Sequence, residues 1–258
     1  MRKAYLITCC LLLLLWQIFA VIINNDVIIP LPLAVISYFL NLFTTSKFYI
    51  AVIYTLKHVF SGFIVSLMVS LILALIGYEY KVVKNLFEPL NIIAKTIPNI
   101  SYIIICLIWF GSTKSVTIIC FLILFPMFYS NFIFALDNMN QDIKDVDILY
   151  HESFIYKIFK HLLPYLVNNI LSTSKTCLSL GFKVGVMAEI LGQVRYGIGK
   201  QLYISKINLD MTGVFAYTIV IIIIGCLINL LFELIIHFYN KKEVYENGET
   251  KCRIIEEN

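Results

Sequence analysis

The sequence predicts an all-α, polytopic membrane protein, and three observations lead to this fold class. Hydrophobic residues make up 60% of the 258-residue chain, whereas charged residues make up only 14%. The mean hydropathy is +0.87. Six apolar runs follow one another, and each is long enough to cross a bilayer as a helix of about 20 residues. A soluble domain carries about 25% charged residues to coat its surface, so a globular cytosolic or secreted protein is excluded.

The same composition excludes other classes of protein. A net charge of +4, from 20 basic and 16 acidic residues, makes no field suited to nucleic acid, and so hydrophobic a chain is not disordered. The 7 cysteines form no CxxC or Cys/His cluster, so neither a disulfide framework nor a metal site is predicted. The length leaves room for roughly six spans, so we expect 1–258 to form a single transmembrane domain.

The first four spans are predicted from uncharged runs. Tyr5–Ile23 follows Met1-Arg2-Lys3, which also suits a secretory signal peptide. Its apolar stretch is longer than that of a signal peptide and no small-residue cleavage site follows, so we expect a retained helix over 5–23. The next three runs predict spans over 57–78, 92–113 and 115–136.

The fifth predicted span, 162–191, differs from the others because it carries Lys175, Lys183 and Glu189. A charge inside a bilayer is costly and is by default a functional candidate. Lys183 and Glu189 lie roughly 120° apart around a helix and about 9 Å apart along it, so they do not form a simple intrahelical pair. One interpretation is a hydrated translocation path lined by Lys183, Glu189 and Ser179. The other is that Lys183 snorkels or pairs with a carboxylate of another helix, and that Glu189 is interfacial. For Lys175 we expect a role of this second kind, either snorkelling or pairing with a carboxylate.

Small residues are frequent in the fifth span, and bulky aliphatic residues in the sixth, which is predicted over 211–236. Small side chains let membrane helices approach closely, so we expect the fifth helix at a helix–helix or subunit interface. The small residues are Ser172, Ser174, Ser179, Gly181, Gly185, Ala188 and Gly192. The run Ile219–Ile224 predicts that the sixth helix has at least one lipid-facing side.

The distribution of basic residues predicts the orientation. Outside the spans, 12 Lys and Arg residues fall on the side of the two termini and 6 on the other. The positive-inside rule therefore places both termini in the cytoplasm. The longest cytoplasmic connection, 137–161, holds five acids and three lysines, so we expect a soluble partner to dock there.

Catalysis is not predicted. The four histidines form no HExxH pair, and the sequence has neither a GxSxG turn nor a GxxxxGK[ST] phosphate loop. We therefore predict no catalytic residue, metal or cofactor, and expect any ATP to be hydrolysed by another chain.

Six short segments resemble, in order, motifs of the six-helix permease subunits of bacterial ABC importers, in the nitrate/sulfonate/taurine branch. No single segment is specific to this family, but six segments in the family's order are strong evidence for the resemblance. The segments are Ile29-Pro30-Leu31-Pro32-Leu33-Ala34-Val35; Tyr54-Thr55-Leu56 with Gly62-Phe63; Glu88-Pro89-Leu90 with Ile97-Pro98; Ile108-Trp109-Phe110-Gly111; Leu162-Leu163-Pro164-Tyr165; and Ala188-Glu189-Ile190 with Gly197-Ile198-Gly199.

The resemblance implies the type I ABC importer permease fold, with a coupling helix before Leu162 that docks on an ATPase subunit. This sequence lacks the glycine that the family's coupling motif carries. An amphipathic helix over 153–161 can still dock, and the alternative is a solvated helix on the bilayer surface. The coupling residues that the resemblance implies are Asp145, Asp147, His151, Glu152, Ser153, Phe154 and Phe159.

The function implied is that of a multi-pass permease in the bacterial cell (inner) membrane. Its implied partners are ATP-binding cassette ATPase subunits, a substrate-binding protein and a second permease copy, with no nucleic acid. Lys183 favours a nitrate-, sulfonate- or taurine-like anion as cargo. Two alternatives stay open: a thiamine-precursor pyrimidine or other small cargo, and a membrane scaffold or enzyme without transport activity.

Overall fold

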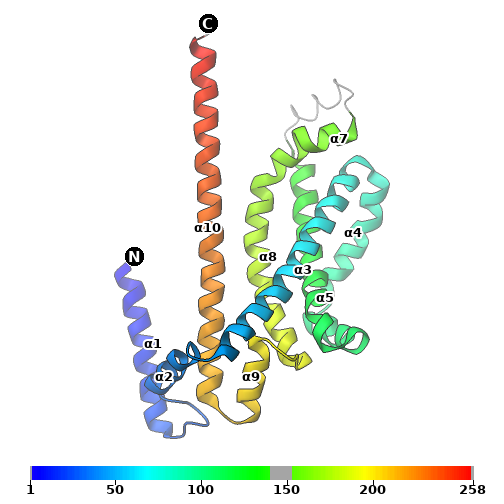
Figure 1. Cartoon of the computed structure of the whole chain (residues 1–258). Helices are drawn as coiled ribbons and strands as arrows, with labels where there is room; N and C mark the ends of the chain where they lie inside the picture. The colour runs from blue at the N-terminus through cyan, green and yellow to red at the C-terminus, as the bar shows by residue number, and fades with distance from the viewer. Residues whose placement is uncertain (1, 140–152, 257–258) are drawn as a thin grey trace.

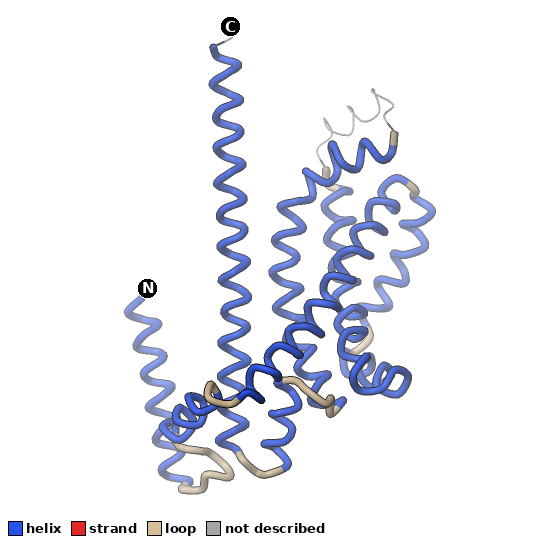
Figure 2. The backbone as a smooth tube through the Cα atoms, in the orientation of Figure 1, coloured by secondary structure: helices blue, strands red, loops and turns tan. Residues whose placement is uncertain are grey.

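The computed structural model describes residues 2–139 and 153–256, and this part of the chain is helical without a strand (Figure 2). The predicted all-α class is therefore confirmed for these residues. Figure 1 shows the order of the helices. They are α1 (Arg2–Ile23), α2 (Pro32–Leu42), α3 (Ser46–Glu79), α4 (Lys81–Thr96), α5 (Asn99–Asp137), α7 (Phe154–Lys157), the π-helical turn η1 (Ile158–Leu162), α8 (Leu163–Gly192), α9 (Ile198–Ile207) and α10 (Met211–Glu256).

Helices α3, α5 and α8 form the core, and glycines set how closely they approach. A Cβ added at Gly62 of α3 would lie 2.6 Å from the Thr117 carbonyl oxygen of α5. A Cβ at Gly181 of α8 would lie 2.9 Å from Leu124 of α5, and one at Gly185 would lie 2.5 Å from Val59 of α3. The small residues of α8 thus serve an interface between helices, which is one of the two interfaces that the sequence predicts.

The chain between α3 and the long straight part of α5 is broken twice. Ile97 and Pro98 separate α4 from α5, because proline has no N–H to donate and holds the residue before it extended (Ile97 ψ 126°). Inside α5, Gly111 has φ 71° and ψ 174°, and the chain turns there. The predicted third span, 92–113, therefore covers parts of α4 and α5, and the second helical segment of α5 begins after Gly111.

Helices α1, α2, α9 and α10 lie beside the core. The Trp16 ring of α1 stacks on Phe215 of α10 at 5.4 Å, and its Nε1 donates to the Pro30 carbonyl. Helix α2 packs on α10, and burial, with the nearby Asp210 carboxylate, raises the pKa of the Tyr38 hydroxyl. Much of α10 is apolar and exposed, as expected of a lipid-facing helix.

The molecule has two ends, which we call the α7 end and the α9 end. The α7 end holds α7, the end of α3 and the end of α5, and an ion pair joins Lys157 to Glu79 there. The start of α1 and the end of α10 point toward the same side (Figure 1). The α9 end holds α2, α9 and the loop that joins α8 to α9.

Three helices of the described residues are long and apolar enough to cross a membrane: Ser46–Glu79, Asn99–Asp137 and Met211–Tyr239. Helix α8 is 30 residues long but contains three charged residues. The count of six spans stays a prediction.

Candidate functional site

A buried carboxylate joins three helices at the α9 end. Glu189, in the last turn of α8, is fully buried. Its Oε2 accepts hydrogen bonds from the Thr55 hydroxyl of α3 at 2.8 Å and from the Gly199 N–H of α9 at 3.0 Å. Its Oε1 lies 3.5 Å from His58 Nδ1. The Thr55 hydroxyl in turn accepts the N–H of Ile198 at 2.8 Å. We call Glu189, Thr55, His58, Ile198 and Gly199 the polar clasp.

The local sequence is suited to bringing the clasp together. Gln193 ends α8 in the left-handed conformation (φ 46°), which turns the chain toward α9. Gly197 has φ 149°, a conformation that favours glycine, and a Cβ there would overlap the Glu189 carboxylate. A Cβ at Gly199 would lie 2.6 Å from Glu189 Cβ. The two glycines therefore leave the space that the carboxylate occupies.

Glu189 was predicted as a site residue from the sequence, but its partners Thr55, His58 and Gly199 were not. The clasp draws on two of the six segments that carried the family resemblance: the one containing Thr55, and the one containing Glu189 with Gly197 and Gly199. A signal was therefore present, but the sequence could not show that these segments meet. Glu189 is buried between helices, and its part in a translocation path stays a prediction.

Lys183 lies on a polar, exposed face of α8. Lys183, Thr176 and Ser172 are all outside the buried part of α8 and lie within about 40° of one another around the helix. Lys183 makes no ion pair with any carboxylate that the structure describes. The sequence placed Lys183 and Glu189 on different sides of one helix, and here one is exposed and the other buried.

Two pockets open along this face toward the α7 end. One, of about 230 Å³, is lined by Asn131 of α5 together with Ser172 and Thr176. The other, of about 510 Å³, is lined by Asn168, Asn169 and the same Ser172. We call the surface of Asn168, Asn169, Ser172, Thr176, Lys183 and Asn131 the polar face.

Two further polar residues of α8, Lys175 and Ser179, contact α10. Lys175 Nζ pairs with Glu233 of α10 at 2.6 Å, so this lysine has a carboxylate partner on another helix. The Ser179 hydroxyl donates to Asn229 Oδ1 at 2.8 Å. Ser179 therefore lies in the contact with α10, beside the polar face, and its role in a path stays a prediction.

Of the predicted coupling residues, Asp145, Asp147, His151 and Glu152 lie outside the described residues. Ser153 precedes α7, and α7 and η1 continue as one helical segment into α8. The half-buried Phe154 ring packs edge-on against Tyr80, which lies between α3 and α4, with the ring centroids 6.2 Å apart. Ile155 and Phe159, one helical turn apart, are 68% and 69% exposed. The exposed apolar pair of this segment is thus Ile155 with Phe159.

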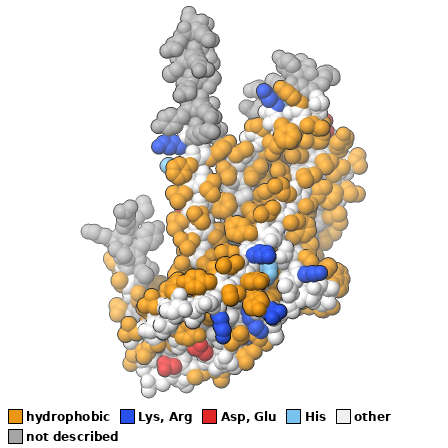
Figure 3. Space-filling model, in the orientation of Figure 1, with side chains coloured by type: hydrophobic (Ala, Val, Ile, Leu, Met, Phe, Trp, Pro, Cys, Tyr) orange, Lys and Arg blue, Asp and Glu red, His pale blue; other side chains and the backbone are white. Residues whose placement is uncertain are grey.

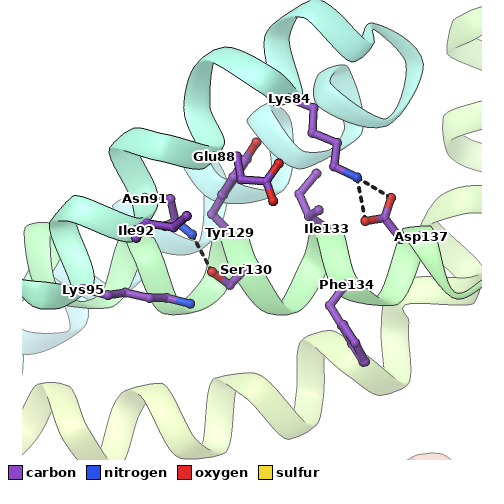
Figure 4. A pocket seen from close by; sticks show the side chains of 10 residues that line it. All are labelled: Lys84, Glu88, Asn91, Ile92, Lys95, Tyr129, Ser130, Ile133, Phe134 and Asp137. Carbon is purple, nitrogen blue, oxygen red and sulfur yellow. Dashed lines mark hydrogen bonds and ion pairs between the residues drawn. The ribbon is translucent and has the colours of Figure 1, made fainter.

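Another polar pocket, of about 250 Å³, lies between α4 and α5 (Figure 4). Lys84 Nζ bonds both oxygens of Asp137 at 2.8 and 2.7 Å. Asn91 and Tyr129 are among the residues that line this pocket. The Asn91 Oδ1 atom and the Tyr129 hydroxyl are buried and have no hydrogen-bond partner among the described residues. Water molecules are expected to bind such groups. This pocket could not be predicted from the sequence, because its residues come from two helices.

Comparison with known proteins gives a consistent picture. Residues 67–243 match the family described as "Binding-protein-dependent transport system inner membrane component". A protein of Methanocaldococcus jannaschii named "Putative ABC transporter permease protein" is 26% identical over 231 residues, which cover 85% of this chain and 84% of the relative. The formylaminopyrimidine transport permease protein ThiX of Halalkalibacterium halodurans is 22% identical over 225 residues, which cover 84% and 86% of the two chains.

Proposed function

We propose that this chain, which belongs to the family of binding-protein-dependent transport system inner membrane components, carries the translocation path of an ATP-driven importer. Membership rests on the family match over residues 67–243, which is more than half of the chain. The chain is thus an ABC transporter permease subunit, like the relatives to which it is similar. A permease of this kind needs few reactive groups, because it works by changing between two packings of its helices.

The observation that carries the proposed path is the polar face of α8. Lys183 and the hydroxyl groups of Ser172 and Thr176 are exposed on this face. A charged side chain that faced lipid would be energetically costly, whereas one that faces a water-filled path is not. Uncharged side chains would suit a lipid contact, whereas this face has a lysine and two adjoining pockets. We infer that the face lines a hydrated path, and that a second copy of the chain closes the path around a twofold axis.

The proposed cargo is a small anion of the nitrate, sulfonate or taurine kind. Lys183 is the charged group of the polar face, and it has no carboxylate partner among the described residues. A thiamine-precursor pyrimidine is the second candidate. It is favoured by the name of the relative from Halalkalibacterium halodurans, which transports formylaminopyrimidine.

The proposed partners meet the chain at its two ends. ATPase subunits would dock at the α7 end, where Ile155 and Phe159 present an apolar surface. This end also carries the greater share of the basic residues, which supports a cytoplasmic position and cytoplasmic termini in a bacterial inner membrane. A substrate-binding protein would then deliver cargo to the α9 end.

Transport in proteoliposomes tests the proposal. The chain is coexpressed with the ATPase and binding protein encoded nearest to its gene, and the purified complex is reconstituted with ATP on the α7 side. We expect ATP-dependent uptake of labelled taurine or nitrate that needs the binding protein. Uptake of labelled formylaminopyrimidine alone would select the second cargo. A complex that takes up none of these, or a chain that retains no ATPase, would favour a scaffold or enzyme without transport activity.

A further inference from the structure

A basic pocket lies at the α9 end, between the start of α3 and the loop that leads into α9. Its volume is about 330 Å³, at the lower end of the range of small-molecule sites. Three cationic side chains line it: Lys47 of α3, Arg195 of the loop and Lys200 of α9. The remaining lining residues are Ile50, Ala51, Tyr196, Gly197, Gln201 and Ile204. We call this the basic pocket.

The three cations of the basic pocket have no anionic partner in the described part of the chain. No carboxylate lines the pocket, and none of the three side chains makes an ion pair with a described residue. Arg195 and Lys200 instead lie over the rings of Tyr196 and Tyr203, at 5.3 and 5.5 Å. Figure 3 shows Lys and Arg side chains gathered on this part of the surface. Like charges held around one cavity repel one another, and a bound anion relieves that repulsion.

The polar clasp adjoins the basic pocket and fixes the position of residues that line it. Gly197 lines the pocket on one side and touches the Glu189 carboxylate on the other. That carboxylate is buried and already accepts hydrogen bonds from Thr55 and Gly199, so it does not reach into the pocket as a counterion. The N–H groups of Ile198 and Gly199 donate to the Thr55 hydroxyl and the Glu189 carboxylate. These two bonds fix the first turn of α9, which carries Lys200, and the end of the loop that carries Arg195.

We infer that Lys47, Arg195 and Lys200 form a binding site for one small oxyanion, such as the sulfonate, phosphate or carboxylate group of a solute. A guanidinium with two ammonium groups supplies charged donors for several oxygens of the anion. The Gln201 amide adds neutral donors, and Ile50, Ala51 and Ile204 suit a short apolar portion. The inference rests on the proposed function in one respect, because that function places the basic pocket at the outer mouth, where cargo arrives.

Binding of sulfate to the purified chain tests the site. The chain is placed in phosphatidylcholine nanodiscs in low-salt Tris buffer, and sulfate is titrated calorimetrically. We expect saturable binding that Arg195→Gln and Lys200→Gln each weaken about tenfold, because each removes one charged donor. Lys206→Gln is the matched control, since Lys206 is exposed on the same helix but does not line the pocket. The control should bind sulfate as the unaltered chain does.

Three results would overturn the inference. They are the absence of saturable binding to the unaltered chain, an equal loss in Lys206→Gln, and unchanged sulfate binding in pocket variants that lose contact with the binding protein. The last result would make the cluster a protein contact. The same variants in the uptake assay separate the two proposals: ATP-driven uptake without sulfate binding defeats only the site, and sulfate binding without uptake of any cargo defeats only the transport function.

Discussion

Thr55 of α3 and Glu189 of α8 are 134 residues apart in the sequence, yet the Thr55 hydroxyl donates a 2.8 Å hydrogen bond to Glu189 Oε2. The same hydroxyl accepts the N–H of Ile198, also at 2.8 Å. Both side chains are fully buried. This one hydroxyl of α3 therefore bonds to both α8 and α9, and it links the three helices at the α9 end.

Replacing Thr55 by valine should destabilise the protein with little change in shape. The valine leaves the Ile198 N–H without its acceptor and the Glu189 carboxylate without one of its donors. A buried polar group left without a partner costs about 1–3 kcal/mol, and more if it is charged. We expect a loss of about 2–4 kcal/mol, measured as a lower midpoint of thermal unfolding in detergent.

The matched control for this change is Thr218→Val. The Thr218 hydroxyl is exposed on α10 and bonds only the Val214 carbonyl of its own helix, at 2.8 Å. Its removal should change the unfolding midpoint little. If Thr55→Val and Thr218→Val melt alike, the clasp does not hold the three helices together.

Gly197→Ala should also be destabilising, because the alanine would need φ near 149° and its Cβ would overlap the Glu189 carboxylate. We expect a loss of about 2 kcal/mol or more in unfolding free energy. Gly225→Ala is the comparison: apart from its chain neighbours and the backbone of its own helix, no atom of the described residues lies within 4 Å of a Cβ at this position in α10. Alanine is the better helix former, so this second variant should be as stable as the parent or more so. Equal melting of the two variants would contradict the geometry of the loop.

The fold class could be predicted from the sequence, because composition and apolar runs decide it before any contact is known. The interface role of α8 was also predictable, since glycines recur along one helix. Helical geometry further placed Lys183 and Glu189 on different sides of α8. Each of these predictions depends on residues that are close in the sequence.

The partners of buried groups could not be predicted, because they come from distant segments. Nothing local to Glu189 indicates Thr55, and nothing local to Phe154 shows that its ring turns against Tyr80. The break at Ile97–Pro98 had a local signal, since proline disfavours a helical residue before it. The prediction gave more weight to the run of uncharged residues than to this proline, so the predicted span 92–113 combined parts of α4 and α5.

The predicted ATPase contact can be tested with Ile155→Ser and Phe159→Ser combined. Both side chains are exposed, so the chain should fold normally while losing the apolar surface that a partner would bury. We expect loss of ATPase copurification in detergent. The control is the pair Leu33→Ser and Ile207→Ser, exposed at the α9 end. Retention of the ATPase by the first pair would show that it docks elsewhere.

The predicted orientation can be tested by labelling single cysteines in a chain without its native cysteines. Cysteines at Asn25 and Lys206, at the α9 end, should react with a membrane-impermeant maleimide in intact cells. Cysteines at Ser153 and Glu249 should react only after permeabilisation. Labelling of Ser153 in intact cells would place the α7 end outside, where it could not meet a cytoplasmic ATPase.

Lys183→Met separates a residue of the path from a structural one. The lysine is exposed and has no carboxylate partner among the described residues, so removing its charge should leave the unfolding midpoint unchanged or raise it. If Lys183 contacts an anionic cargo, uptake should fall about tenfold, which corresponds to the loss of one charged hydrogen bond.

Two further variants, Lys206→Met and Lys175→Met, serve as controls for Lys183→Met. Lys206→Met removes a charge away from α8 and should leave uptake intact. Lys175→Met removes the partner of Glu233 on α10, so it should lower the unfolding midpoint more than Lys183→Met does. Lys183→Met with normal uptake and normal melting would mean that the ammonium only extends toward water. A lower midpoint in Lys183→Met would instead indicate a carboxylate partner, supplied by a second copy of the chain or by residues outside the described ranges.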